Sequence, residues 1–173
     1  MLSRGKIEGA CRITIGVDPG QSGAFALLAD GEPVRVFDMP ISSRKAGGHE
    51  VNPAAIVIEL RAALAHYPGS HIFAVMEQVA ARPGQGVSSM FRFGESYGIV
   101  KGVLAAMGIG YRSVTPGVWK RHCCLTGSNK DTARTQTIQQ FPAAAEWLQR
   151  KRDIGRADAI LIARWAWETE GHL

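Results

Sequence analysis

Three acidic residues of the sequence end or interrupt segments that are otherwise apolar. Asp18 closes the β-branched run that starts at Ile13, and Glu77 closes the apolar run that starts at Ile72. Asp158 lies inside an apolar helical pattern, with an alanine on each side. Burying a carboxylate is costly unless a cation lies next to it, so we expect each of these acids to have a cationic partner. Carboxylates from separate elements are ligands that Mg²⁺ prefers, and paired Mg²⁺ ions hydrolyse phosphodiesters in many enzymes.

Simpler explanations exist for each acid taken alone. Asp18 precedes Pro-Gly, which is ordinary turn chemistry, and Asp158 has Arg156 and Arg164 as alternative salt-bridge partners. Asp153 lies five residues before Asp158, about 500° round an α-helix, and therefore does not share its face. It can join the other acids only from the loop or cap that precedes the helix.

The elements that must position these acids follow from apolar periodicity and from turn and capping residues. The acids at 18 and 77 end the first and fourth of five predicted strands, and the acid at 158 lies in the last helix. The strands are 13–18, 24–28, 34–38, 71–77 and 111–114. The helices are 53 to before 68, 87–107, a short one opened by Thr115-Pro116, one with a capping box at Ser128 and Asp131 that ends near 141, and 154–167.

This order predicts a single α/β domain over residues 13–173, with a mixed five-stranded sheet and helices on both faces. Residues 1–12 are predicted to be a loose leader, and residues 42–50 a mobile loop. Gly94, Gly98 and Gly102 form a bare stripe along the helix 87–107. We expect this stripe to pack on the sheet of its own chain, with a dimer interface as the alternative.

The charge of the chain favours an acidic partner such as nucleic acid. The 173 residues carry a net charge of +5, and many of the basic residues fall in the last third. Nothing in the sequence has the length and apolarity of a membrane span or a signal peptide. Three cysteines, an odd count without metal-ligand spacing, favour a reduced intracellular setting.

Five segments together resemble the RuvC-like Holliday junction resolvases of the RNase H-like superfamily, in family order over nearly the whole chain. They are Gly16-Val-Asp-Pro-Gly20, Met76-Glu-Gln-Val79, Phe93-Gly-Glu-Ser-Tyr-Gly98, Lys130 within Asn-Lys-Asp, and Gly155-Arg-Ala-Asp-Ala159. The bacterial pattern has an acid at the position of Gly155. Its replacement by Asp153, in an Asp-x-Gly-Arg-Ala-acid string, is closer to the phage and chloroplast branches.

The resemblance implies metal ligands at Asp18, Glu77 and Asp158, completed by Asp153, and a catalytic or DNA-contacting lysine at Lys130. Two Mg²⁺ ions per site are expected, with Mn²⁺ able to substitute and no small-molecule cofactor. Asp18 would bridge both ions. The aromatic that follows Glu-Gln-Val in bacterial members is Ala80 here, and Phe91 or Phe93 are candidates to replace it.

The implied activity is resolution of four-way DNA junctions by symmetric nicks, made by a homodimer in the cytoplasm of a bacterial or phage-infected cell. Six basic residues are candidate DNA contacts, namely Lys120, Arg121, Lys130, Arg134, Arg152 and Arg156. Alternatives are an RNase H-like nuclease acting on flaps, forks or RNA:DNA hybrids, and a junction-binding protein without catalysis. An actin-like or sugar-kinase nucleotide site also matches Asp-Pro-Gly-Gln-Ser-Gly, but such proteins are longer and need a second phosphate loop.

Overall fold

The apolar runs of the sequence form one five-stranded sheet in the order β3-β2-β1-β6-β7. The computed structural model describes residues 11–45, 47–78, 80, 84, 86–127 and 129–170. The strands are β1 (Arg12–Asp18), β2 (Ala24–Ala29), β3 (Glu32–Asp38), β6 (His71–Glu77) and β7 (Gly110–Val114). β1, β2 and β3 run antiparallel as a meander, while β6 and β7 run parallel to β1. The predicted mixed sheet is confirmed.

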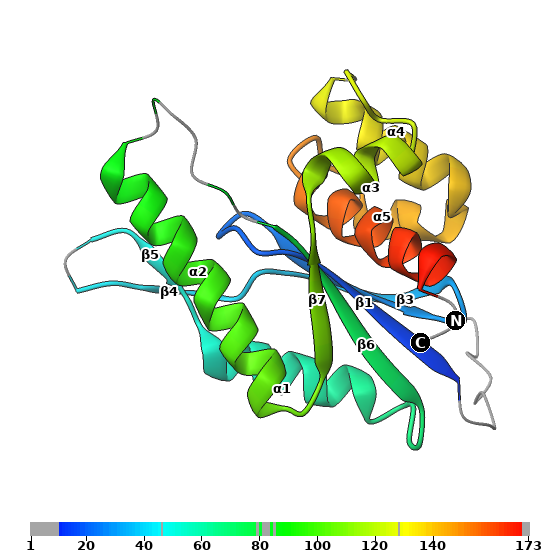
Figure 1. Ribbon diagram of the computed structural model, residues 1–173, viewed down its shortest axis with the longest axis horizontal. Coiled ribbons are helices and arrows are strands. Elements are labelled where there is room, and N and C mark those ends of the chain that lie inside the picture. The colour runs from blue at the N-terminus through cyan, green and yellow to red at the C-terminus, as the bar shows by residue number, and fades with distance from the viewer. Residues whose placement is uncertain are drawn as a thin grey trace.

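Helices cover both faces of this sheet (Figure 1). They are α1 (Pro53–Leu64), α2 (Val87–Ala106), α3 (Pro116–His122), α4 (Lys130–Gln140) and α5 (Ile154–Thr169), with a 3-10 helix η1 (Pro142–Trp147). One core cluster joins the sheet to α3, α4 and α5, and the other joins it to α1 and α2. Strand β1 contributes to the second cluster through Ile13, Ile15 and Val17, all fully buried.

The predicted boundaries of the strands and helices agree with the structure to within a few residues, with three differences. A short hairpin, β4 (Ile41–Ser43) with β5 (His49–Val51), occupies part of the region predicted to be a loop. Strand β1 begins at Arg12, inside the predicted leader. The N-cap of α4 is Asn129, whose side-chain oxygen accepts from two backbone N–H groups, whereas Ser128 was predicted and lies outside the described residues.

The expected packing of the glycine stripe against its own sheet is wrong. Gly94, Gly98 and Gly102 are exposed, and a Cβ placed on any of them would meet no described atom within 4 Å. The core face of α2 instead carries Val100 and Leu104, both fully buried. None of the described helices is long and apolar enough to cross a membrane.

Candidate metal-dependent nuclease site

Asp18 and Glu77 lie side by side because their strands are parallel neighbours. Val17 of β1 is paired with Met76 of β6, and each acid is the next residue of its strand. The carboxyl ends of adjacent parallel strands meet at the same edge of a sheet, where ligands commonly bind. The strand pairing therefore places two carboxylates at one edge without any unusual backbone geometry.

Helix α5 brings the third acid to this edge by crossing directly over β1. A Cβ on Gly16 would lie 2.0 Å from the carbonyl oxygen of Ala159, so only glycine permits this approach. A Cβ on Gly155 would lie 3.3 Å from Oδ2 of Asp18. The first turn of α5 therefore lies against the Asp18 carboxylate, and Asp158 follows one turn later.

The three acids act on one another electrostatically. Burial raises the pKa of Asp18 to about 6, and the charge of Glu77 adds to this rise. Burial also raises the pKa of Asp158 to about 7, with further contributions from the charges of Asp18 and Glu77. Such clusters of raised carboxylate pKa values are typical of functional sites, and a bound cation would relieve the repulsion.

The salt bridges considered for Asp158 are absent among the described residues, because both candidate arginines bind other acids. Arg156 donates to Asp38 through Nε at 2.6 Å and through a second nitrogen at 2.7 Å. Arg164 donates to Glu168 at 2.7 Å.

Helix α3 completes the site with two residues. Lys120, predicted as a DNA contact, lowers the pKa of both Asp18 and Asp158 by its charge, although burial outweighs it. Trp119 donates its indole N–H to Oε2 of Glu77 at 2.8 Å. Sequence reasoning did not assign Trp119 any role. The available signal was its place one turn after β7, the strand beside the one that ends in Glu77.

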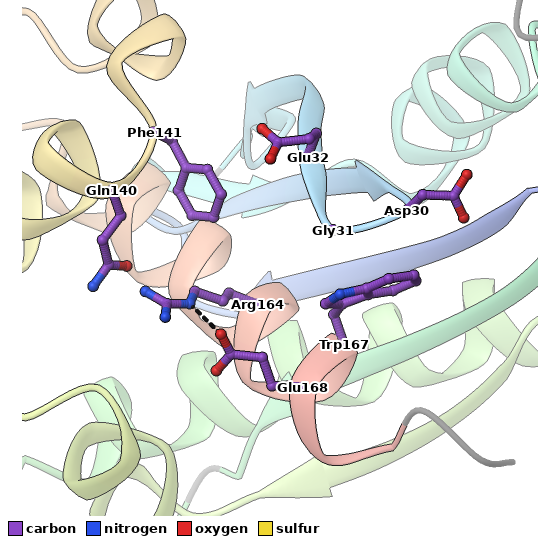
Figure 2. Close-up of a pocket in the computed structure, with 8 residues that line it drawn as sticks. All are labelled: Asp30, Gly31, Glu32, Gln140, Phe141, Arg164, Trp167 and Glu168. Carbon is purple, nitrogen blue, oxygen red and sulfur yellow. Dashed lines mark hydrogen bonds and ion pairs between the residues drawn. The ribbon is translucent and has the colours of Figure 1, made fainter.

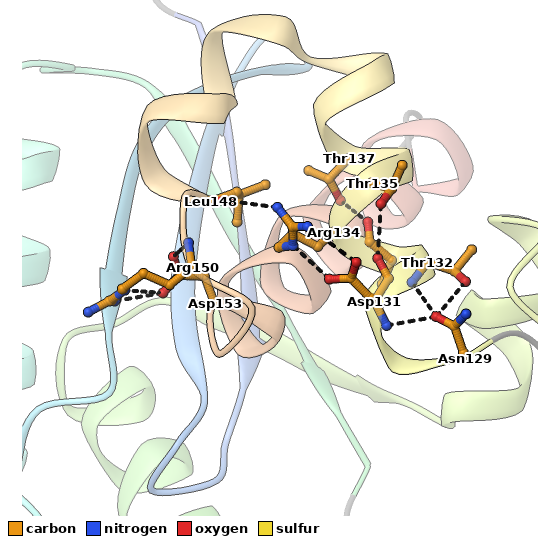
Figure 3. A network of polar contacts seen from close by, with 10 residues as sticks. Asn129, Asp131, Thr132, Arg134, Thr135, Thr137, Leu148, Arg150 and Asp153 are labelled. Atoms are coloured by element: carbon orange, nitrogen blue, oxygen red, sulfur yellow. Dashed lines mark hydrogen bonds and ion pairs between the residues drawn. The ribbon is translucent and has the colours of Figure 1, made fainter.

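Asp153, the fourth predicted ligand, is engaged by Arg150 in this structure (Figure 3). Its carboxylate accepts the backbone N–H and the Nε–H of Arg150, both at 2.8 Å, and the residue is 3% exposed. Burial opposes ionisation, but these bonds hold the pKa of Asp153 below its usual value. Asp153 thus caps the turn before α5, among different neighbours from those of Asp18 and Asp158.

The predicted DNA contacts divide into two groups. Arg134 bonds Asp131 at 2.7 Å and the carbonyl of Leu148 at 3.0 Å, as Figure 3 shows, and Arg156 bonds Asp38 and the carbonyl of Trp147. These two guanidinium groups hold loops in place. The remaining candidates include Arg121 and Arg152, which are exposed. Lys130 begins α4, and its side chain lies outside the described part of the chain.

The aromatic candidates at the start of α2 occupy different positions. Phe91 is 70% exposed. Phe93 is half-buried, and a Cβ on Gly20 would lie 3.6 Å from its ring. Phe93 therefore lies beside the turn that follows Asp18, whereas Phe91 projects into solvent.

The donor set of the site suits a hard divalent cation, since Asp18, Glu77 and Asp158 offer only oxygen ligands. No group of three or more His, Cys, Asp or Glu side chains within the described ranges is already arranged to hold an ion. Burial is the main cause of the raised pKa values of Asp18 and Asp158, and the charges of the neighbouring acids add to it, so a cation at this edge would offset both.

A separate cavity of about 360 Å³ lies between the turn joining β2 to β3 and the ends of α4 and α5 (Figure 2). Its lining includes Glu32, Phe141 and Trp167, together with the ion pair of Arg164 and Glu168. Asp30 lines it as well and accepts the backbone N–H of Arg12, at the opposite end of β1 from Asp18. The cavity is thus distinct from the carboxylate site.

The fold of this chain is similar to that of RuvC, with a mixed five-stranded sheet and helices on both faces. Thermus thermophilus RuvC in complex with a Holliday junction substrate matches with a TM-score of 0.56 and 14% sequence identity, over 93% of this chain and 97% of that chain. A structure described as Thermus thermophilus RuvC matches with a TM-score of 0.52 and 14% identity, over 92% and 96%. The predicted fold class is confirmed.

A particular relative emerges from the sequence comparison. The chain is 30% identical over 151 residues to the chloroplastic Holliday junction resolvase MOC1 of Chlamydomonas reinhardtii. That match covers 77% of this chain and 17% of the relative, so the chain spans about a sixth of that protein's length. No family model matches the chain. The resemblance to the RuvC-like resolvases is confirmed in sequence and in fold.

Proposed function

We propose that the chain is a structure-selective endodeoxyribonuclease that resolves four-way DNA junctions with paired symmetric nicks. The observation that carries this proposal is the gathering of Asp18, Glu77 and Asp158 at one sheet edge, where the charge of Glu77 contributes to the raised pKa values of Asp18 and Asp158. Three carboxylates in a partly buried site beside a lysine fit metal-dependent phosphodiester hydrolysis better than binding alone. The similarity to proteins described as Holliday junction resolvases supports a branched DNA substrate.

In the proposed reaction the three carboxylates hold two Mg²⁺ ions, for which Mn²⁺ substitutes. The ions supply activation of the attacking water and stabilisation of the leaving oxygen. A P–O ester bond breaks as the water oxygen bonds to phosphorus, and the leaving oxygen takes a proton. Lys120 is proposed to contact a nonbridging phosphate oxygen, supported by the effect of its charge on Asp18 and Asp158, and Lys130 is proposed as a second phosphate contact. Asp153 would join as a ligand only after Arg150 releases it.

Binding is proposed to depend on the DNA backbone and on junction shape, and therefore to fall steeply with salt. Exposed Arg121 and Arg152 are the proposed backbone contacts, with Phe91 as the aromatic that opens the junction. Paired nicks require two sites, so the active form is proposed to be a homodimer. All three cysteines are free thiols, which fits the reducing cytoplasm of a bacterial or phage-infected cell.

The test is cleavage of a mobile four-way junction in Mg²⁺, compared with duplex, flap, fork and RNA:DNA hybrid substrates. We expect symmetric nicks in the junction alone. Asp18→Asn, Glu77→Gln and Asp158→Asn should each reduce the rate by about a thousandfold, because each removes a charged ligand. Junction binding in Ca²⁺ should persist in these variants.

Asp153→Asn serves as the matched comparison, since it alters an acid of the same type that is bound by Arg150. Wild-type cleavage rates for both Asp18→Asn and Asp158→Asn would refute the proposed enzyme. If flaps or hybrids are cut faster than the junction, the protein is a nuclease with a different substrate from the one proposed. Junction binding without cleavage under any metal would identify a binding protein.

A further inference from the structure

The carboxylate of Glu77 accepts a hydrogen bond from the buried indole of Trp119. Trp119 is fully buried and is the largest of the fully buried side chains. Its indole N–H is a donor only, and a buried donor without a partner is costly. That donor lies 2.8 Å from Oε2 of Glu77. We propose that Trp119 is a positioning residue, which fixes Glu77 so that its second oxygen faces the metal ions; this inference rests on the proposed function.

The backbone makes this contact a consequence of topology. Glu77 is paired with Val114 at the ends of β6 and β7, and Gln78 donates its backbone N–H to the carbonyl of Val114 at 2.7 Å. Helix α3 begins two residues after Val114, and Trp119 is the fourth residue of its first turn. Trp119 lies at the position of that turn from which the indole reaches Glu77.

The indole is locked by its surroundings, which distinguishes it from a mobile donor. Trp119 belongs to the core cluster that includes Cys123, Leu125 and Leu148. The ammonium group of Lys120 lies 5.1 Å from the centre of the indole ring. Because core packing fixes the ring, the bond to Glu77 has a defined direction before any ion arrives, which lowers the cost of assembling the site.

The end of α3 is also tied to α5, the helix that carries Asp158. His122 contacts Oε2 of Glu168 at 2.5 Å, and Arg164 donates to the other oxygen of the same carboxylate. α3 is thus connected to β6 through Trp119 and to α5 through His122. This short helix therefore contacts both the strand that carries Glu77 and the helix that carries Asp158.

The test begins with the hydrogen bond itself, in protein without metal or DNA. The indole N–H proton of Trp119 should give an NMR resonance shifted downfield, and Glu77→Gln should move it while the other indole signals stay in place. Adding Mn²⁺ to wild-type protein should broaden this signal before those of the remaining tryptophans. A Trp119 signal that Glu77→Gln leaves unchanged would overturn the inference.

The second test is metal affinity, measured by Mn²⁺ calorimetry and by the Mg²⁺ concentration that gives half-maximal cleavage. Trp119→Phe keeps an aromatic ring but removes the donor. It should raise the Mn²⁺ dissociation constant and the half-maximal Mg²⁺ concentration about 10- to 100-fold. This is the usual effect of losing a partner that orients a metal ligand. The rate at saturating Mg²⁺ should recover most of its wild-type value.

Trp165→Phe is the matched control, because Trp165 is also a core residue, 6% exposed, and contacts Arg112 rather than the site acids. It should leave the metal affinity at the wild-type value. In protein that already carries Glu77→Gln, Trp119→Phe should cause no further loss of metal affinity. If it lowers the affinity there as much as in wild type, Trp119 acts through packing alone. Wild-type protein that binds no Mn²⁺ would defeat the proposed function, whereas equal affinity of wild type and Trp119→Phe would defeat only the positioning role.

Discussion

At the scale of single residues, Asp153 and Asp158 lie five residues apart in the sequence but have pKa values shifted in opposite directions. Burial raises the pKa of Asp158 to about 7, and the charges of Asp18 and Glu77 add to this rise. Asp153 accepts two hydrogen bonds from Arg150, so its pKa is lowered despite burial. The two aspartates should therefore contribute to folding stability with opposite pH dependence.

Without divalent cations, the wild-type free energy of unfolding should fall as pH rises from about 4 to 7. A raised pKa means that folded protein binds the proton more tightly than unfolded protein, so the stability that protonated Asp158 contributes is lost in this window. Asp158→Asn should therefore gain about 2 kcal/mol over wild type at pH 8. This is about half of the value for the full shift, because water screens the site and Asp18 shares the interaction.

Urea unfolding in EDTA at several pH values is the measurement, with Asp153→Asn as the comparison of opposite sign. The depressed pKa of Asp153 gives stability above pH 4 that is lost on acidification, so Asp153→Asn should be less stable than wild type at pH 8. A loss of stability in Asp158→Asn at pH 8 would show that the acids do not repel one another.

At the scale of elements, the approach of α5 to β1 explains why an acid is missing at Gly155. A Cβ at this position would lie 2.6 Å from the carbonyl oxygen of Ser22 and 3.0 Å from Cα of Gly23, both in the turn after β1. These are backbone atoms, which cannot rotate away. The turn and the helix therefore exclude any larger residue at 155.

Gly155→Asp should consequently not add a working ligand. We expect it to lower the free energy of unfolding by about 1–3 kcal/mol through overpacking, and to reduce junction cleavage. Gly155→Ala is the control for sterics alone, and should cost less because it adds no charge near Asp18. Urea unfolding and cleavage rates should be measured for both variants. A stable Gly155→Asp protein that cuts faster than wild type would contradict this account of the packing.

Sequence predicted the elements well because their signals are local, and it predicted part of the site for the same reason. Asp18 and Glu77 end apolar strands, and ends of neighbouring parallel strands meet. The bond between Trp119 and Glu77 depends on where α3 lies after β7, which no local pattern encodes. The engagement of Asp153 was open to prediction, because Arg150 stands at the i,i+3 spacing of an ion pair.

At the scale of the whole molecule, the exposed glycine stripe gives α2 a face that nothing within the described chain covers. Gly94, Gly98 and Gly102 have open space above them. Sequence reasoning identified the stripe but not its direction, because Val100 and Leu104 compete for the core on the same helix. The outward stripe supports α2 as the contact between two subunits of the proposed homodimer.

Gly98→Leu should therefore convert a dimer into monomers, as measured by light scattering during size-exclusion chromatography. The fold should remain and its stability should rise by up to about 1 kcal/mol, because leucine favours helix more than glycine does. Ala62→Leu, at an exposed position of α1, is the control and should stay dimeric. A wild-type monomer, both free and with junction DNA, would exclude this assembly.

The crossing of α5 over β1 also has a consequence for biosynthesis. Asp18 is made early, whereas Asp158 and the helix that covers Gly16 are made some 140 residues later. A nascent polypeptide on the ribosome consequently lacks one wall of the carboxylate site until α5 has left the exit tunnel. The proposed nuclease activity should thus begin only after synthesis of this helix is finished.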